Sequence, residues 1–255
     1  MQVKRKKEKV KIIGFDQDED ALAAAQERLA GFDGIEYIHD NFSHLKDHVK
    51  EPVDGILFDL GISSFQIDEA SRGFSLRSDG PLDMRMDRSQ KLTAADIVNN
   101  WPAEELTKIF YEYGEEKFSR RIAREIEKMR KAEVGMRNIE TTFQLKEIIE
   151  KAIPTWKKRE SVTRVFQSLR IAVNNELASL KQALEQATEL LKPGGRIVVI
   201  AYHSLEDRIV KLALRESAKN GILKLLTKKP LLAGEPELAG NPRARSAKLR
   251  AAEKL

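Results

Sequence analysis

The sequence predicts an α/β protein built on a doubly wound, mostly parallel sheet that a helical insertion interrupts. Continuous apolar runs predict three strands buried on both faces, at Val10–Phe15, Val53–Leu60 and Arg196–Tyr202. A weaker run at Ile35–Ile38 follows an alanine-rich helix predicted over Glu19–Leu29. Strands that alternate with helices in this way are typical of a doubly wound sheet.

The alternation stops in residues 92–160, where the pattern predicts only helices. Phe118, Ile122 and Ile126 recur at helical spacing, and charged residues separate them. We therefore expect a helical insertion domain over 92–160. It divides a core made of residues 1–91 and 161–255.

The sheet resumes after the insertion. A long helical pattern runs from about Val162 to Leu191, and Pro193-Gly-Gly195 separates it from the last strong strand. A helix follows at Leu205–Ala218. The tail then offers two closing strands, Ile222–Thr227 and Ala247–Lys254.

Composition excludes several classes of protein. The 255 residues contain no cysteine, which rules out disulfides, zinc–thiolate sites and thiol nucleophiles and is consistent with a reducing cytoplasm. No apolar run approaches the roughly 18 residues of a membrane span. The net charge is +5, and residues 207–255 hold twelve basic against five acidic side chains. This distribution suits a polyanionic partner, although ordinary solvated surface charge would look the same.

Two acidic residues follow apolar strands directly, and these are the main site candidates. Asp16 and Asp59 should lie at the carboxyl edge of the sheet, where doubly wound proteins bind ligands. A carboxylate there can accept hydrogen bonds from both hydroxyls of a ribose. The alternative is that Asp16 or Asp18 only caps the following helix.

The turn after Asp59 offers further polar groups. Gly61 lets a ligand approach the backbone, while the hydroxyls of Ser63 and Ser64 and the amide of Gln66 supply donors and acceptors. A plain strand-to-loop turn is the alternative. Arg72–Asp87, which alternates Arg with Asp, predicts either a functional loop or a surface loop whose charges pair internally.

Two basic elements complete the candidates. His203 should point toward the ligand edge from the end of the last strong strand, with Ser204 capping the next helix, although such histidines are more often structural. His44 and His48 have helical spacing but no evident third ligand, so we predict no metal site. Arg243 and Arg245 lie on a turn in the basic tail, where they suit phosphate contacts or simple solvation.

Nine motifs occur in a fixed order: Phe58-Asp-Leu-Gly-Ile-Ser-Ser64, Arg72-Gly-Phe-Ser75, Asp79-Gly-Pro-Leu-Asp-Met-Arg-Met-Asp87, Tyr113-Gly-Glu-Glu-Lys117, Phe166-Gln-Ser-Leu-Arg-Ile171, Asn174-Asn-Glu-Leu177, Pro193-Gly-Gly-Arg196, His203-Ser-Leu-Glu-Asp-Arg208 and Asn241-Pro-Arg-Ala-Arg-Ser246. The series closely resembles the bacterial 16S ribosomal RNA cytosine-N4 methyltransferase family (RsmH/MraW), from about Val10 to the C-terminus.

The resemblance implies a class I S-adenosylmethionine-dependent fold with a helical insertion. It implies transfer of a methyl group to the N4 amine of a decoding-region cytosine in 16S rRNA of the small ribosomal subunit. Matched residue by residue, the cofactor contacts would be Asp16 at the ribose, Phe42 beside the adenine, and Asp59 and Gln66. For the proton acceptor, the candidates are Ser63, Ser64 and His203.

One family motif has no counterpart in this sequence. The family begins with an Asp-Gly-Thr strand end that runs into a Gly-x-Gly-Gly-His turn, and no such segment occurs here. We therefore expect an N-terminally truncated copy that lacks the first strand and binds the cofactor weakly or not at all; a redesigned site is the alternative. The alternative function is a non-catalytic RNA- or ribosome-binding remnant; a dehydrogenase is disfavoured, because no hydride-transfer constellation is evident.

Overall fold

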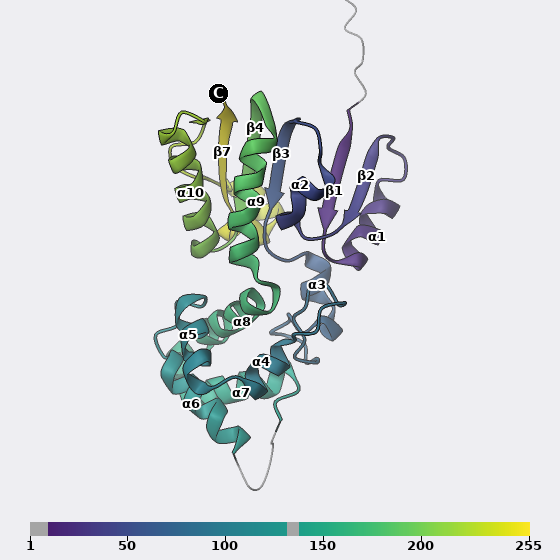
Figure 1. Ribbon diagram of the computed structural model, residues 1–255. Coiled ribbons are helices and arrows are strands. Elements are labelled where there is room, and N and C mark those ends of the chain that lie inside the picture. Colours follow the sequence, from purple (N-terminus) through teal and green to yellow (C-terminus); the bar gives the residue numbers. More distant parts are fainter. Residues whose placement is uncertain (1–9, 132–137) are drawn as a thin grey trace, which may run out of the picture.

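A computed structural model of the chain describes residues 10–131 and 138–255, and Met1–Lys9 of the first predicted domain lie outside this range. Two units are stacked in it (Figure 1). The strands and the helices within residues 19–48 and 176–219 form the upper unit, and the helices within residues 94–174 form the lower one. No helix in the described part of the chain is both long and apolar enough to span a bilayer.

The first half of the chain forms short alternating elements, as predicted. Two capping boxes, at α3 and α4, fix where these helices begin, because side chain and backbone satisfy each other's free groups. The elements are β1 (Ile12–Asp16), α1 (Glu19–Arg28), β2 (Ile35–His39), η1 (Phe42–His44), α2 (Leu45–His48), β3 (Val53–Asp59), α3 (Ser64–Asp68), η2 (Ala70–Arg72) and α4 (Ala94–Asn100).

The helical unit continues through the predicted insertion. Its core contains the predicted stripe on α6, because Ile122 and Ile126 are fully buried. The same hydrophobic core contains residues before and after the predicted insertion, because it extends from Phe74 to Val173. Its elements are α5 (Ala103–Glu112), α6 (Ser119–Arg130), α7 (Thr142–Ala152), η3 (Thr155–Lys157) and α8 (Lys158–Asn174).

The long helix predicted from Val162 to Leu191 is wrong, because two helices replace it. Asn175 adopts a left-handed conformation with φ of 50° and separates α8 from α9 (Glu176–Leu190). Asparagine tolerates this conformation better than most residues do. The break lets α8 pack in the helical unit while α9 covers the sheet (Figure 1).

The C-terminal elements confirm both predicted closing strands. The strand β4 (Leu191–Ala201) begins earlier than predicted, since Pro193-Gly-Gly195 lies inside it and not before it. The remaining elements are α10 (Ser204–Lys219), β5 (Leu223–Leu225), β6 (Leu231–Leu232), α11 (Glu235–Gly240), η4 (Pro242–Ser246) and β7 (Lys248–Lys254).

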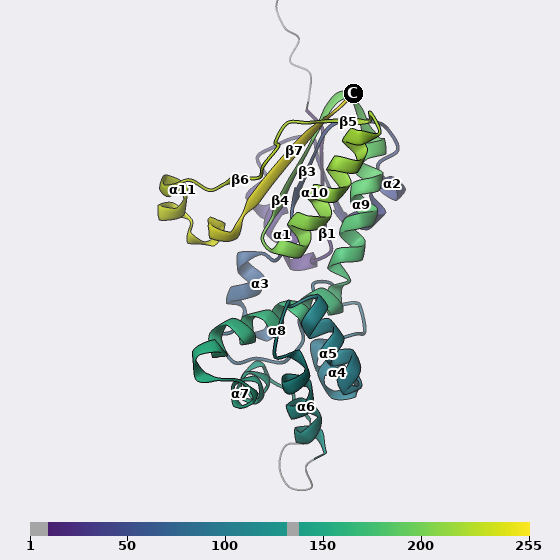
Figure 2. The same ribbon diagram turned by 90° about the vertical axis from the view of Figure 1, so that its left-hand side faces the viewer.

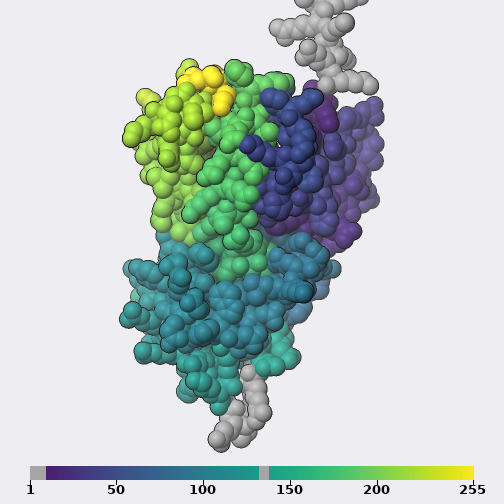
Figure 3. Space-filling view, in the orientation of Figure 1, coloured from purple at the N-terminus to yellow at the C-terminus, as the bar shows by residue number. Residues whose placement is uncertain are grey.

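The strands form two separate sheets. In one sheet, β1 pairs with β2 in parallel. The other sheet has the order β3-β4-β7-β5. In this sheet β4 is parallel to β3 and antiparallel to β7, and β6 also pairs with β7. The expectation that Val10–Phe15 and Val53–Leu60 are strands buried on both faces is wrong, because Ile12 is 51% exposed and Leu57 is 65% exposed. Figure 3 shows the outer surface of these segments, coloured purple to dark blue. Within the described residues, neither β1 nor β3 pairs with a strand on the side that faces the other sheet.

Candidate functional site

A cavity of about 1420 Å³ lies between β1 and β3, and we call it the central cavity. Asp16 ends β1 and Asp59 ends β3, and both line it. Phe42, Ser63 and Gln66 also line it, whereas Ser64, His203, Arg243 and Arg245 do not. The structure therefore brings together all four residues that the resemblance assigns to the cofactor.

Asp16 is not the cap of the first helix. The side chain of Asp18 fills that role by accepting from the Asp20 amide, and Asp16 Oδ1 accepts from the Asp18 amide at 2.9 Å. Burial raises the pKa of Asp16, and the nearby charge of Asp18 adds to this, while the backbone amides of Asp18 and Gln17 oppose it. Asp16 is thus held as a partly desolvated carboxyl group at the cavity wall.

Arg72 joins three segments beside Asp16. Its side chain is 1% exposed, and it donates to the carboxylates of Asp18 and Asp20 and to the backbone carbonyls of Arg85 and Met86. A buried guanidinium is stable only when its donors are satisfied, and here both terminal nitrogens, Nη1 and Nη2, have acceptors. The network fixes the loop after α3 against the start of α1.

Gln66 is also part of this network. Its Oε1 accepts from the Ser63 amide at 2.9 Å, its Nε2 donates to Asp18 Oδ2, and the residue is 3% exposed. Both ends of the amide are therefore occupied within the protein. Gln66 touches the cavity, but its contacts hold α3 in place, and its cofactor role stays a prediction.

Phe42 offers an aromatic surface at the cavity. It begins η1, whose N-cap is Asn41, and its ring packs edge-to-face on Phe58 with a centroid distance of 5.7 Å. Edge-to-face packing fixes a ring and leaves its other surface available for stacking. Phe42 is half-buried, which suits a residue that covers one side of a planar ligand.

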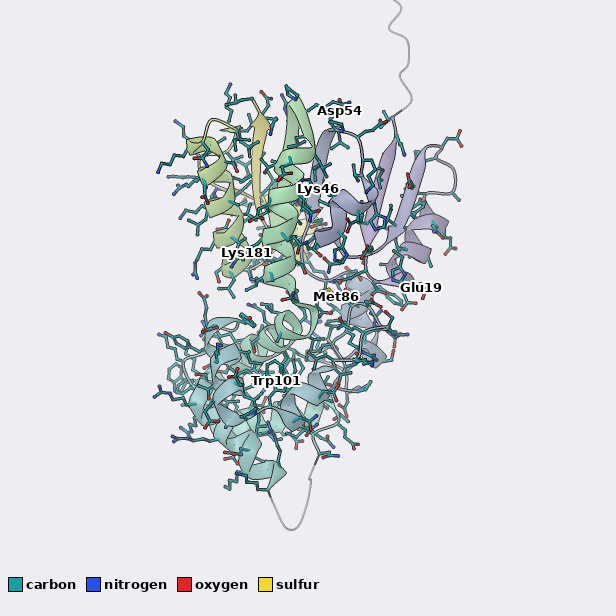
Figure 4. The ribbon with its side chains drawn as sticks, viewed as in Figure 1. Glu19, Lys46, Asp54, Met86, Trp101 and Lys181 are labelled. Atoms are coloured by element: carbon teal, nitrogen blue, oxygen red, sulfur yellow. The ribbon has the colours of Figure 1, made fainter. Side chains whose placement is uncertain are left out.

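The loop between Arg72 and Asp87 packs into the helical core, so it is not a surface loop, although Arg85 and Asp83 do pair within it as that alternative expected. Leu82 and Met84 are each 1% exposed, and Met84 has a φ of 61°. Asn174 holds this strained segment: its Nδ2 donates to the Met84 carbonyl at 2.8 Å and its Oδ1 accepts from the Met86 amide at 2.7 Å. Figure 4 shows Met86 at the junction of the two units, and Met86 also lines the central cavity.

Tyr202 is a site residue that the sequence reasoning missed. Its hydroxyl donates to Asp59 Oδ1 at 2.9 Å, and burial together with this bond raises the pKa of Tyr202 to about 12. The phenol therefore stays protonated and orients Asp59 at neutral pH. Its position next to His203 in a strand-end motif was the available signal.

His203 caps a helix and is not a cavity residue. It is the N-cap of α10, in a capping box with Glu206, so the prediction that Ser204 caps this helix is wrong. The Nε2 atom of His203 lies 3.3 Å from Glu206 Oε1, and only 11% of its side chain is exposed. Glu206, its partner, does line the central cavity.

Glu176, His203 and Glu206 carry metal-ligating atoms that lie within 4.8 Å of one another. Arg170 already donates to both oxygens of Glu176, at 2.8 and 2.9 Å. A guanidinium ion thus supplies the positive charge that this cluster requires. The donor set fits an ion-pair network better than a metal centre.

His44 and His48 share a partner that the sequence did not reveal. Asp40 accepts from both rings at 2.8 Å, which ties the end of β2 to α2. Burial raises the pKa of Asp40, but the two histidine hydrogen bonds outweigh it and lower that pKa to about 2.

The two predicted RNA-binding arginines have different surroundings. Arg243 donates to both carboxylate oxygens of Asp68 on α3, at 3.0 and 3.1 Å, so it braces η4 against the site. Arg245 is exposed and forms no ion pair with any residue in 10–131 or 138–255. Of the two, only Arg245 presents an uncompensated charge.

Paired strand-end carboxylates at one cavity, on the carboxyl edge of parallel strands, are typical of α/β proteins that bind a ligand at this edge. A sequence model described as the MraW methylase family matches residues 2–255. The chain belongs to this family, and its fold is that of a class I methyltransferase with helices inserted.

Two relatives are each named ribosomal RNA small subunit methyltransferase H. The protein from Nostoc punctiforme is 51% identical over 250 residues, which cover 96% of this chain and 80% of the relative. The protein from Brevibacillus brevis is 48% identical over 268 residues, covering 96% and 84%. Among solved structures, an rRNA methylase from Streptococcus thermophilus aligns with a TM-score of 0.42 and 13% identity, over 96% of this chain and 74% of that one.

Proposed function

We propose that this protein methylates 16S rRNA of the small ribosomal subunit, with S-adenosylmethionine as methyl donor and the N4 amine of a decoding-region cytosine as acceptor. Family membership and the names of the two relatives support methylation of small-subunit rRNA. The observation that carries the proposal is the convergence of Asp16, Phe42 and Asp59 on one cavity. We place the reaction in the cytoplasm, where ribosomal subunits occur.

The residues of the central cavity fit this cofactor. Asp16 would accept from the ribose hydroxyls, Phe42 would stack beside the adenine, and Asp59 and Gln66 would border the remainder. The fit rests on the partly desolvated carboxyl group of Asp16 and on the half-buried ring of Phe42, both at the cavity. When bound, the cofactor supplies a methyl group activated by a sulfonium.

The acceptor amine needs orientation and a route for its proton. Its lone pair is delocalised into the cytosine ring, so hydrogen-bond acceptors must align it for in-line attack. Asp59, oriented by Tyr202, and the hydroxyl of Ser63 lie at the cavity and can do this. Ser64 and His203 remain candidates for proton acceptance; neither lines the cavity, but Glu206, which contacts His203, does. The target base would leave its stack to reach this edge.

The second candidate function is a non-catalytic RNA-binding protein of the same family. The separation of β1 from β3 favours it, because the site-bearing strands are not joined by backbone hydrogen bonds within the described residues. In this case the protein would bind the small subunit without transferring a methyl group.

Mass spectrometry of nucleosides distinguishes the two functions. Small ribosomal subunits that lack the modification are incubated with protein and S-adenosylmethionine, then digested. Methyl transfer to cytosine N4 supports the proposal, whereas a methyl group on a ring carbon or on adenine refutes it. Retained subunit binding without any methylation identifies the second function.

Two variants and one control tie the activity to the cavity. Asp16→Ala and Asp59→Ala should weaken cofactor use more than RNA binding. Asp33→Ala is the matched control, because Asp33 is exposed in the turn between α1 and β2 and does not line the central cavity. Equal losses in all three variants would contradict the assignment.

A further inference from the structure

Trp156 is an exposed aromatic residue that the folded chain does not use. It lies in η3, between α7 and α8, and its exposed fraction of 77% is the highest among the large apolar side chains in the described part of the chain. Ile153 and Val162, on either side of it, are buried and hold this connection in the helical core. Core packing therefore does not explain the tryptophan.

The surroundings of Trp156 are positively charged. Lys157, Lys158 and Arg159 follow it directly, and Lys157 Nζ lies 5.1 Å from the centroid of the indole ring. Lys157 also pairs with Glu160, and Lys158 Nζ lies 4.0 Å from Glu150 Oε2, whereas Arg159 forms no ion pair within residues 10–131 and 138–255. From Lys146 to Arg164 the chain holds six basic and three acidic residues.

The same side of the molecule carries a second basic element. Figure 2 shows that the connection between α7 and α8 projects in the same direction as α11 and the segment that follows it. That segment is η4, which contains Arg243 and the unpaired Arg245. A polyanion that contacted both would cross from the helical unit to the α/β unit.

An exposed aromatic ring beside cations is the arrangement that binds single-stranded nucleic acid. Bases stack on the ring regardless of sequence, while the cations contact the adjacent phosphates. A protein partner would require a broader apolar surface, but the neighbours of Trp156 in the sequence are polar or charged: Thr155, Lys157, Lys158 and Arg159.

We propose that Trp156, with Lys157, Lys158 and Arg159, forms a stacking platform for single-stranded RNA that flanks the target cytosine. The inference rests on the proposed function for the class of substrate. It adds a contact outside the central cavity, in the helical unit.

Binding of an RNA oligonucleotide, without cofactor, tests the platform. The probe is a 16-nucleotide single strand of decoding-region sequence, and a duplex of the same length is the comparison. Trp156→Ala should weaken binding of the single strand by roughly 5- to 150-fold, the effect expected for one lost stacked base. Trp156→Phe should retain most of the affinity, because it keeps an aromatic face.

Tyr111→Ala is the matched control. Tyr111 is 65% exposed on α5, where the next residue in the chain is Glu112, so its removal should leave RNA affinity within twofold of the wild type. Equal affinity of Trp156→Ala and the wild type for the single strand would overturn the proposal. Loss of binding to whole ribosomal subunits, but not to the oligonucleotide, would also overturn it and identify a protein contact.

Intrinsic fluorescence reports stacking directly. The chain has two tryptophans, and the other one, Trp101, packs against the helical core (Figure 4). The single strand should quench the emission of the wild type and leave that of Trp156→Phe unchanged. Quenching without methyl transfer would refute the proposed reaction but support the stacking platform. Methyl transfer without quenching would support the reaction and refute the platform.

Discussion

Removal of the buried guanidinium of Arg72 should destabilise the protein strongly. Arg72→Met retains much of the side-chain volume but leaves the carboxylate of Asp18, which is 2% exposed, without its cationic partner. Breaking a buried ion pair from one side costs about 3–5 kcal/mol. At roughly 2–4 °C per kcal/mol, the melting temperature should fall by about 6–20 °C.

Urea unfolding monitored by circular dichroism measures this effect. Arg88→Met is the matched control, because Arg88 approaches the same acidic cluster through Asp20 but is exposed, at a distance of 4.0 Å. Its replacement should change the free energy of unfolding by less than about 1 kcal/mol. The double variant Arg72→Met with Asp18→Asn should recover part of the loss, because the unpaired charge is gone.

A loss below about 1 kcal/mol for Arg72→Met would refute this reasoning. It would mean that water or a rearranged side chain compensates Asp18. Binding of S-adenosylhomocysteine should fall along with stability, because the Arg72 network also holds the Met86 carbonyl beside the central cavity.

Three further predictions concern groups at or near the cavity. The pKa of Asp16 is raised, so the contribution of this group to stability is lost as pH rises. Asp16→Asn should therefore leave the melting temperature at pH 7 unchanged or raise it. The same change should weaken cofactor binding measured by calorimetry. Tyr202→Phe, which removes the donor to Asp59, should lower the rate of methyl transfer about tenfold while the fold stays intact by circular dichroism. Asp40, with its lowered pKa of about 2, stabilises the fold above pH 4 and loses this effect as pH falls toward 2, so Asp40→Asn should flatten acid unfolding in that window.

The sequence predicted every described strand except β6, and the helices α1, α6 and α10, because their patterns are local. Apolar runs and stop signals identified β1 to β4, and the stripe of Ile122 and Ile126 identified α6. The break at Asn175 escaped prediction because the helical pattern continues through it. Only the packing of α8 in one unit and α9 in the other requires a left-handed residue there.

The site could be predicted in part. Strand ends located Asp16 and Asp59, because a parallel sheet brings such positions to one edge. The partners of these residues could not be found in this way. Arg72 lies 54 positions from Asp18, and Tyr202 lies 143 positions from Asp59, so only the tertiary fold reveals the two hydrogen bonds.

Side-chain hydrogen bonds hold each half of the candidate site in place, one at the end of β1 and the other at the end of β3. Arg72 and Gln66 hold Asp18 at the start of α1, Asn174 holds the loop at Met86, and Tyr202 orients Asp59. Between the two strands themselves no backbone ladder exists within the described residues, and Leu57 is exposed. The two halves of the cavity can therefore move relative to each other more easily than strands of one sheet. A ligand that contacts both Asp16 and Asp59 would couple the halves, so cofactor binding should stabilise the fold as well as start the chemistry.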